Sequence, residues 1–534
     1  MPGALTRPIA AGTLRVDAIS RDRLAIGIAY ALAWAAMLVN RGLYWDDWSL
    51  AGQSSASIVQ AFRELGMPWL GILQAAILAM PSPGLVGHAV VFGTYLLSAL
   101  ILHAILCRTP GLSRLDALVA ALTFAVLPVN YARIALIDLP YGLSLLAFLA
   151  ATWLLIEYLD RGGLGRRIGA LALYLLSFST ASLLILYAVP MALAAVIVWR
   201  SGKVSLRAFI PRHADFIAIP VVFWLLKSAF FAPTGAYEGY NALTLRGLSR
   251  VPRELLPIPA QTLGEPLVRA IAVGGLLGVA VGVVVAIWLF RRSRVVETGD
   301  FIAAPWLALI GVALLALGVV GYLAVDRIPT IWDWSSRHQL LVPLGAGLLA
   351  ASAARGLRSR HLVARAVGLS VGLLIGISMV ADARTLVAYQ ADWFKQVALM
   401  QAAKSDPAIQ AARHIRVTDA ATGLNTLRRT YRFYEYNAIF AEALGDTTRL
   451  VAPAGRDPAA KDVATFIPRP AYHMGQYVPS PIDLDLAISM PRGKPGGLEV
   501  LRLVVLEAFD PLAFESEVSD LIEVDTVPVA SAAS

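Results

Sequence analysis

Long apolar stretches separated by short polar segments dominate the first 381 residues of the chain. A transmembrane helix needs about 20 mostly apolar residues. By that measure the pattern predicts eleven spans, over residues 24–40, 85–107, 115–131, 139–159, 168–179, 181–199, 214–231, 266–290, 303–325, 339–355 and 363–381. The run 168–199 is too long for one upright helix and short for two. We expect a break at Ser177–Ser182, where hydroxyl groups can satisfy the backbone of a tight turn.

The segment between the first two spans predicts two short helices rather than a simple turn. Within Ser49–Leu65, the apolar residues Ile58 and Phe62 fall on one helical face, which is typical of a helix lying in the membrane interface. The second helix, over Trp69–Met80, is too short to cross a bilayer. In the span 266–290, glycines repeat every four residues from Gly274 and predict a close-packing face.

Composition changes after Ala381, where charges and prolines become frequent. About 150 residues suffice for one small domain, with helices expected at 387–404 and 433–444 and strands at 448–452 and 498–506. The predicted fold is mainly α: a polytopic helix bundle of about eleven spans with juxtamembrane helices and a small α/β domain. We divide the chain into an amino-terminal segment (1–23), a membrane region (24–381) and a carboxyl-terminal domain (382–534).

The composition fits this interpretation and excludes a soluble globular protein. Of 534 residues, 58% are hydrophobic and only 15% are charged, whereas soluble proteins carry about 25% charged residues. Basic residues gather in alternate loops, as at Arg21, Arg166 and Arg291, and such loops face the cytoplasm. The amino terminus is therefore expected inside, and an odd number of spans places the carboxyl-terminal domain outside. A single cysteine and scattered histidines predict neither a disulfide nor a metal site.

Two adjacent carboxylates stand just after the first span, in Tyr44-Trp45-Asp46-Asp47-Trp48. Acids close to hydrocarbon are costly and often functional. The alternative is structural, because tryptophans are common at the membrane interface and an aspartate can cap a helix. From position alone, both interpretations stay open.

Other polar side chains are expected on the same side of the membrane. Arg133 and Asp138 flank a short loop, and Lys227 lies near the outer end of the seventh span. Later, Trp334-Ser-Ser-Arg337-His338 leads into a span that contains Pro343. Helix capping is the alternative for Asp138, and snorkelling toward the interface is the alternative for Arg337.

Together these motifs resemble the GT-C membrane glycosyltransferases, the class that includes protein mannosyltransferases and lipid A aminoarabinose transferases. The matching features extend over residues 20–381: the acidic pair, the juxtamembrane helices, the Pro-containing corner Leu127–Arg133 with Asp138 after it, two short spans, and the Arg337–His338 pair. The chain departs from the pattern in two places. Several relatives have Lys-Glu between the short spans where this chain has Ser-Thr-Ala-Ser, and Asp47 replaces the Glu of protein mannosyltransferases.

The resemblance implies a reaction class but no particular substrate. A polyprenyl-phosphate sugar would be the donor, and the hydroxyl of a lipid, glycan or protein the acceptor, on the periplasmic side of a bacterial inner membrane. No cofactor or metal is required by this scheme, and no nucleic acid takes part. Transfer with inversion needs one base in an oxocarbenium-like transition state.

The resemblance also assigns roles to particular residues. Asp46 aligns with the first acid of the family's pair and is the expected base, while Asp47 orients or caps and Asp138 is a second catalytic acid. The candidates for binding the donor phosphate are Arg337, His338, Arg133 and Lys227. The candidates for stacking on sugar rings are Trp45, Trp48 and Trp334.

Three other functions compete with this interpretation. Ion-coupled transporters and flippases bury ionisable groups within their spans and show repeated broken helices, but the predicted span centres lack acids and no internal repeat is visible. An O-antigen ligase or polymerase would place its basic residues in one large late outer loop. In a structural membrane protein, the acidic pair would have no chemical role.

Overall fold

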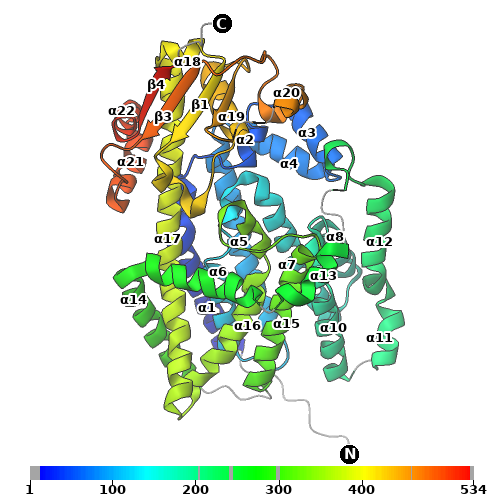
Figure 1. Cartoon of the computed structure of the whole chain (residues 1–534). Coiled ribbons are helices and arrows are strands. Elements are labelled where there is room, and N and C mark those ends of the chain that lie inside the picture. Colours follow the sequence, from blue (N-terminus) through cyan, green and yellow to red (C-terminus); the bar gives the residue numbers. More distant parts are fainter. Residues whose placement is uncertain are drawn as a thin grey trace, which may run out of the picture.

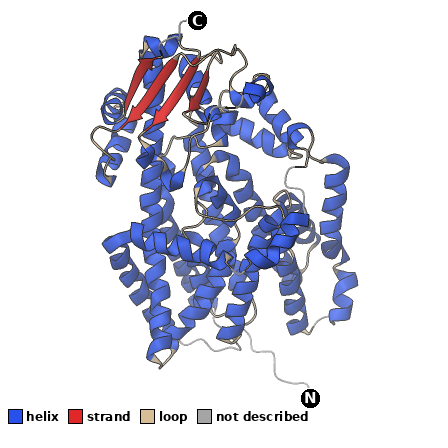
Figure 2. Ribbon diagram, viewed as in Figure 1, coloured by secondary structure: helices blue, strands red, loops and turns tan. Residues whose placement is uncertain are grey.

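The computed structural model describes residues 12–202, 205–239, 245–255, 257–295, 301–456, 458 and 460–529. Residues 1–11 of the expected amino-terminal segment lie outside the described residues. Helices make up most of the molecule, and a four-stranded sheet lies at one end, beside the carboxyl terminus (Figures 1 and 2). The mainly helical fold with a small mixed α/β region at the carboxyl end is confirmed.

Within the described ranges, seven helices are long and apolar enough to cross a membrane, or eight if one bent pair is counted. The seven cover Ile19–Val39, Pro83–Leu106, Leu136–Arg161, Ala181–Arg200, Ala260–Ser293, Ala304–Leu323 and Leu362–Ser405. They correspond to α1 (Gly12–Trp34) with η1 (Ala35–Val39), α5 (Pro83–Leu106), α7 (Leu139–Arg161), α9 (Ala181–Leu186) with α10 (Ala188–Ser201), α14 (Glu265–Ser293), α15 (Ala304–Leu323) and α17 (Leu362–Ser405). The chain is therefore a multi-pass membrane protein by helix length and hydropathy.

The prediction of eleven spans counted three helices that are shorter. These are α6 (Arg114–Val126), α8 (Leu164–Ser177) and α12 (Ala214–Phe230), with 13, 14 and 17 residues. At 1.5 Å per residue they reach about 20–26 Å, less than the roughly 30 Å of a hydrocarbon core. Helix α6 ends one residue before Leu127, because the proline that follows Leu127 disfavours helical backbone there. The predicted break after Ser177 is confirmed, since α9 begins at Ala181.

The glycine repeat of α14 packs against α17, as predicted. Gly274, Gly278 and Gly282 are buried. A Cβ atom on Gly278 would lie 3.3 Å from the Cα of Ile377, and one on Gly282 would lie 2.5 Å from the carbonyl oxygen of Leu373. The missing side chains therefore let the two backbones approach closely.

The segment after the first span forms α2 (Asp46–Leu50), α3 (Ser55–Glu64) and α4 (Pro68–Leu78). The Ser54 side chain caps α3 by accepting a hydrogen bond from the Ser57 N–H at 3.2 Å. Ile58 and Phe62 are buried with Leu70 of α4 in one small apolar cluster. The two predicted juxtamembrane helices are therefore present.

Two segments of short 3₁₀ helices connect helices of the bundle, one between α6 and α7 and one between α15 and α16. The first holds η2 (Tyr131–Ile134) and η3 (Leu136–Asp138), and the second holds η6 (Asp333–Gln339). A hydrogen bond of 2.8 Å from the Ala132 N–H to Ser336 Oγ joins them. Helix α16 (Val342–Ala354) starts after η6 with Pro343 in its first turn, at an angle of 61° to η6.

Helix α17 runs without a break from the bundle into the carboxyl-terminal region, so the boundary predicted between 381 and 382 falls inside a continuous helix. The sheet beyond it has the order β2-β1-β3-β4 and comprises β1 (His414–Asp419), β2 (Leu450–Pro453), β3 (Leu484–Ser489) and β4 (Glu523–Pro528). Strand β1 is parallel to β2 and β3, with Ile415 opposite Val451 and Leu484, whereas β4 runs antiparallel to β3.

The other described helices are α11 (Leu206–Arg212), α13 (Leu245–Glu254), α18 (Pro407–Ala411), α19 (Phe433–Leu444), α20 (Ala460–Phe466), α21 (Gly497–Phe509) and α22 (Pro511–Leu521). Helix α19 and strand β2 confirm the predictions at 433–444 and 448–452. The strand predicted at 498–506 is wrong, because this segment is α21. Its buried residues Val500, Leu503 and Glu507 recur at spacings of three and four, which is a helical face.

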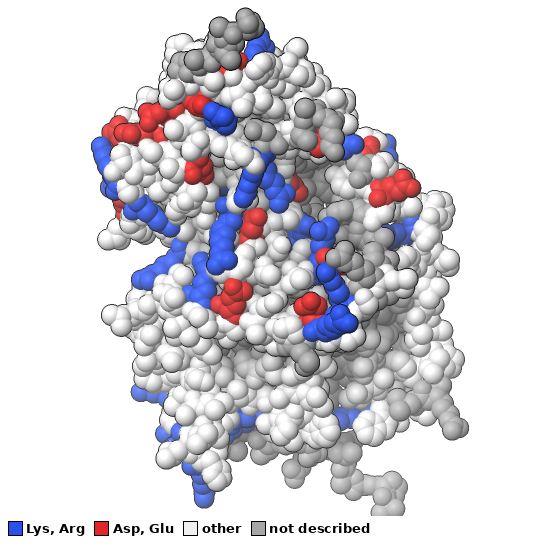
Figure 3. All heavy atoms as spheres, in the orientation of Figure 1, with Lys and Arg blue, Asp and Glu red and all other residues white. Residues whose placement is uncertain are grey.

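The surface charge follows this architecture (Figure 3). On the face drawn, charged side chains of both signs gather on the carboxyl-terminal region and at the level just below it. A broad band beneath them is almost free of charge, and Lys and Arg return at the opposite end. A surface almost free of charged side chains can face lipid, because charged groups are costly in hydrocarbon.

We expect Gly376→Ala to destabilise the protein. A Cβ atom at this position would lie 2.5 Å from the Cα of Gly282, so α14 and α17 would have to separate. Overpacking of this kind costs about 1–3 kcal/mol, measurable as a lower midpoint of thermal unfolding in detergent. Gly27→Ala is the matched control, because a Cβ there meets nothing within 4 Å. Equal midpoints for the two variants would contradict this account of the helix pair.

Candidate functional site

A strained turn presents the two adjacent aspartates. Trp45 precedes α2 with φ = 52°, a conformation that costs a non-glycine residue roughly 1–3 kcal/mol. Its backbone N–H donates to Glu435 Oε2 at 3.2 Å, and its indole Nε1–H donates to Asp333 Oδ1 at 2.6 Å. Segments far apart in the sequence therefore hold the turn from which Asp46 and Asp47 project.

The Asp47 carboxylate is buried and fully engaged by the backbone. It accepts hydrogen bonds from the N–H groups of Tyr44 at 3.0 Å, Leu136 at 2.9 Å and Ile137 at 2.7 Å. Burial raises the pKa of Asp47 to about 7, although the three N–H groups stabilise its charged form. These contacts fit the expected orienting or capping role and leave Asp47 little capacity to accept a proton from a ligand.

Asp46 is the half-buried acid of the pair. Its Oδ1 accepts a hydrogen bond of 2.6 Å from the hydroxyl of Tyr434, at the start of α19. Burial and the nearby Asp46 carboxylate raise the pKa of Tyr434, so the hydroxyl stays protonated and donates. Arg432 Nη1 in turn donates to the Tyr434 oxygen at 3.1 Å. Tyr434, a residue of the carboxyl-terminal region, therefore orients the Asp46 carboxylate.

Asp138 and Arg337 lie on two segments that contact the acidic turn. The Asp138 carboxyl is buried at the end of η3, and neither oxygen has a hydrogen-bond partner in the part of the chain that the structure describes. Asp47 accepts the N–H groups of Leu136 and Ile137, the two residues directly before Asp138. The Trp45 ring lies against that of Trp334, over which the Arg337 guanidinium lies. The structure thus brings together the three segments that carry the predicted site residues Asp46, Asp47, Asp138 and Arg337.

The Arg337 guanidinium lies over the ring of Trp334, with its Cζ atom 4.2 Å from the ring centroid. Its Nε donates to His338 Nε2 at 3.3 Å. The Trp334 ring also contacts the Trp45 ring, with centroids 5.4 Å apart. Arg337 forms no ion pair within 4.0 Å with any described carboxylate, so its charge is available to an anion.

A scan against protein-family models finds no match to this sequence, and a comparison with curated proteins also finds none. The chemistry of the site must therefore be inferred from its side chains. The carboxylate of Asp46 can accept a proton and the guanidinium of Arg337 can bind an anion, and their segments contact each other through Trp45, Asp333 and Trp334. Among the residues described, no three His, Cys, Asp or Glu side chains are placed to hold a metal ion.

Other residues predicted for the site lie elsewhere or are covered by protein. Arg133 is buried between the rings of Trp34 and Tyr95. Its Cζ atom is 3.8 Å and 4.4 Å from the two ring centroids, so the side chain packs inside the bundle. Lys227 lines a separate cavity of about 120 Å³ beside α12 that includes Trp69.

The predicted sugar-binding tryptophans differ in exposure. Trp45 and Trp48 are buried, with exposed fractions of 0% and 2%. Neither presents an open face to a sugar in this arrangement. Trp334 is half-buried and lies beside Arg337, which makes it the best placed of the three for stacking.

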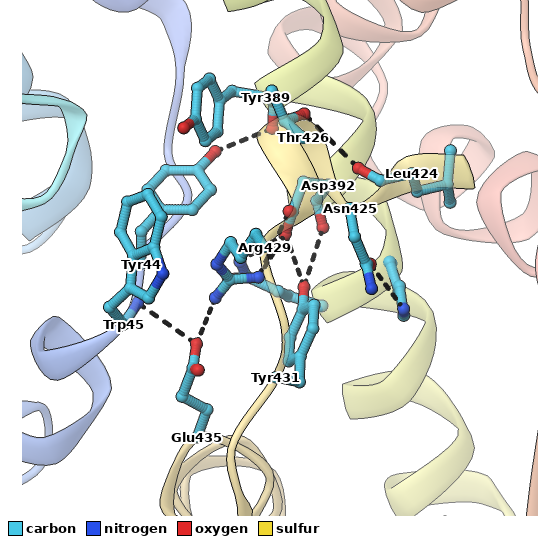
Figure 4. Close-up of polar contacts among 12 residues, drawn as sticks. Tyr44, Trp45, Tyr389, Asp392, Leu424, Asn425, Thr426, Arg429, Tyr431 and Glu435 are labelled. Atoms are coloured by element: carbon cyan, nitrogen blue, oxygen red, sulfur yellow. Dashed lines mark hydrogen bonds and ion pairs between the residues drawn. The ribbon is translucent and has the colours of Figure 1, made fainter. Parts of the chain in front are cut away.

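A fully buried ionic cluster holds the turn that precedes Asp46 (Figure 4). Arg429 Nη1 donates to Asp392 Oδ1 at 2.9 Å, and its Nη2 pairs with Glu435. The Tyr431 hydroxyl donates to the same Asp392 oxygen at 2.6 Å. Burial raises the pKa of Glu435 to about 7, although the Arg429 charge opposes this. Because Glu435 also accepts the Trp45 N–H, the cluster joins α17 and α19 to the acidic turn.

No sequence motif pointed to Tyr434, Glu435 or Arg429 as part of the site. They were assigned to a separate carboxyl-terminal domain, and no motif linked them to Asp46. One signal was present: residues 428–436 read Arg-Arg-Thr-Tyr-Arg-Phe-Tyr-Glu-Tyr, an unusually dense run of cationic and phenolic side chains. Only the fold places this run against the first loop.

An apolar cavity of about 250 Å³ lies within the bundle, among α6, α14, α16 and α17. Its walls include Leu263 and Leu267, and neither Asp46 nor Arg337 lines it. Between these two leucines in the sequence, Glu265 accepts a hydrogen bond of 2.6 Å from the indole of Trp332. The segment that forms one wall of the cavity is therefore hydrogen-bonded to the segment that leads to Arg337.

We expect Asp47→Asn to lower stability. Both carboxylate oxygens accept backbone N–H groups, so an amide nitrogen at either position would face a donor. A buried donor left without a partner costs about 1–3 kcal/mol, and thermal unfolding in detergent should report the loss. A variant as stable as wild type, but inactive, would show instead that Asp47 takes part in chemistry.

Proposed function

We propose that this protein is a membrane glycosyltransferase of the GT-C type, which moves a sugar from a polyprenyl-phosphate donor to an acceptor hydroxyl. The observation that carries the proposal is the set of contacts that joins the acidic turn to the segments of Asp138 and Arg337. Asp47 accepts the Leu136 and Ile137 N–H groups, and Trp45 contacts Asp333 and Trp334. Arg337 has no described carboxylate partner within 4.0 Å. The multi-pass helix bundle supports a lipid-linked substrate, because such a donor is confined to the bilayer.

The proposed step is an inverting displacement at the anomeric carbon. The acceptor oxygen forms the new bond to that carbon as the bond to the phosphate oxygen breaks, with an oxocarbenium-like transition state. The acceptor proton passes to Asp46, whose position is supported by the Tyr434 hydrogen bond. The departing phosphate takes the electron pair, and the Arg337 guanidinium stabilises its charge, with His338 beside it.

The surroundings suggest where the substrates bind. The apolar cavity lined by Leu263 and Leu267 suits part of the polyprenyl chain. Trp334 suits one face of the transferred sugar. In this proposal the site lies on the outer side of a bacterial inner membrane, with the amino terminus in the cytoplasm, and the acceptor is a lipid, glycan or protein.

One observation favours a second candidate, an ion-coupled transporter. Asp382 is fully buried within α17, one residue beyond the predicted end of its span. Its Oδ1 accepts a hydrogen bond of 2.8 Å from the Tyr131 hydroxyl, and its Oδ2 has no partner among the described residues. A buried acid of this kind is also found in ion pathways.

We expect Asp46→Asn to slow sugar transfer strongly while the protein still folds. Loss of a general base lowers the rate by about 10²–10⁴-fold, and the Tyr434 hydroxyl can still donate to the amide oxygen. The assay incubates purified protein in nanodiscs with undecaprenyl-phosphate mannose, glucose or arabinose and a lipid, glycan or peptide that carries a free hydroxyl, and it follows donor consumption by mass spectrometry. Glu64→Gln, in the same loop, is the control. Transport with no donor consumption, lost in Asp382→Asn and retained in Asp46→Asn, would instead establish the transporter.

Tyr434→Phe should lower kcat and leave the donor KM nearly unchanged. The hydroxyl contacts Asp46 and orients it. A hydrogen bond to a charged group is worth about 1.5–3 kcal/mol, which corresponds to roughly 10–100-fold in rate. Tyr472→Phe serves as the control, because its ring packs against Tyr434 without a described contact to Asp46. Full activity in Tyr434→Phe would remove this residue from the mechanism.

A further inference from the structure

Helices α21 and α22 form an antiparallel hairpin on the carboxyl-terminal region. The corner between them is Asp510, whose carboxylate caps α22 by accepting the Ala513 N–H at 3.2 Å. Arg502 and Glu517, at similar distances along the chain from the corner, form an ion pair with an Nη1–Oε1 distance of 2.9 Å. The two helices therefore lie side by side, and the corner at Asp510 forms one end of the hairpin.

One face of the hairpin is fixed to α17. The ring of Phe514 packs against that of Phe394, with centroids 5.3 Å apart. Trp393 Nε1 donates to Glu507 Oε1 at 3.0 Å. Val500 and Leu503 are buried on the same side of α21, so the hairpin has a defined orientation.

The outward face of the hairpin is apolar and uncovered. Large side chains at spacings of three and four form a stripe along α21 that continues past the corner, and each is 46–86% exposed: Leu498, Leu501, Val505, Phe509 and Leu512. The residues nearest the corner, Phe509 and Leu512, are exposed by 86% and 80%. Contiguous exposure of this kind marks an interaction surface.

The corner lies next to the surface that the first span presents to lipid. Glu507 Oε1 is 3.7 Å from Nε of Arg41, two residues after the end of that span at Val39. Leu38 and Val39 are themselves exposed by 37% and 45%. Figure 1 draws α22 beside the sheet and α21 below it, on the side toward α14. The apolar corner is thus continuous with the lipid-facing surface of the bundle.

We propose that the α21–α22 corner inserts into the adjoining leaflet of the bilayer and anchors the carboxyl-terminal region to the membrane surface. Phe509 and Leu512 enter the boundary between headgroups and acyl chains, to a depth of about 5–10 Å. Arg41 and Asp510 lie at the headgroup level, which suits their charge. This inference does not depend on the proposed enzyme activity.

The single cysteine, Cys107, makes the test direct. In a Cys107→Ser background, nitroxide labels are attached at Phe509→Cys or Leu512→Cys, and the protein is placed in nanodiscs of phosphatidylcholine and phosphatidylglycerol. Both positions should collide freely with oxygen, which partitions into lipid, and poorly with a water-soluble nickel chelate. Val478→Cys is the control: it is 75% exposed on the same region but outside the hairpin, and its label should show the reverse order.

Two outcomes would overturn the proposal. Free collision with the nickel chelate at both hairpin positions would place the corner in water. Exclusion of both reagents would mean that protein covers it, and dipolar broadening between labels would identify a second copy of this chain. Because both sites are exposed, labelling should preserve the fold, which the elution profile in detergent verifies, and each position serves as a check on the other.

Discussion

The arrangement of the site depends on one buried guanidinium. Arg429 is fully enclosed and is neutralised by Asp392 on α17 and by Glu435 on α19. A charge in this position is tolerated only when its partners are held close. The same Glu435 accepts the Trp45 N–H, so the requirement to neutralise Arg429 also fixes a backbone turn that Trp45 would not adopt by itself. The acidic pair is therefore presented by the contact between the first loop and the carboxyl-terminal region.

This contact gives two identical residue types different properties. Asp47 is enclosed by three backbone N–H groups and ties α2 to the segment before α7. Its neighbour Asp46 is half-buried, and its carboxylate accepts a hydrogen bond from the Tyr434 phenol. Adjacent positions on a short helix point in different directions, and the surroundings then decide which acid is structural and which is available for chemistry.

The membrane region imposes a second constraint, which the long helix α17 transmits. Its lower half packs against α14 through facing glycines, and its upper half carries Asp392 of the ionic cluster and Trp393 beside the hairpin. One rigid helix thus connects the apolar bundle, the acidic turn and the surface of the carboxyl-terminal region.

The sequence by itself determined what depends on local pattern. Apolar length predicted the spanning helices, the glycine repeat predicted a packed helix pair, and the position of Asp46 and Asp47 after the first span marked them as candidates. The same approach overcounted the spans, because α6, α8 and α12 are apolar but short, and it read α21 as a strand. Tertiary structure alone decided that Tyr434 contacts Asp46, across 388 positions of sequence, and that Arg429 supports the Trp45 turn. Such contacts leave no local periodicity, because they arise from the way α17 carries one part of the chain against another.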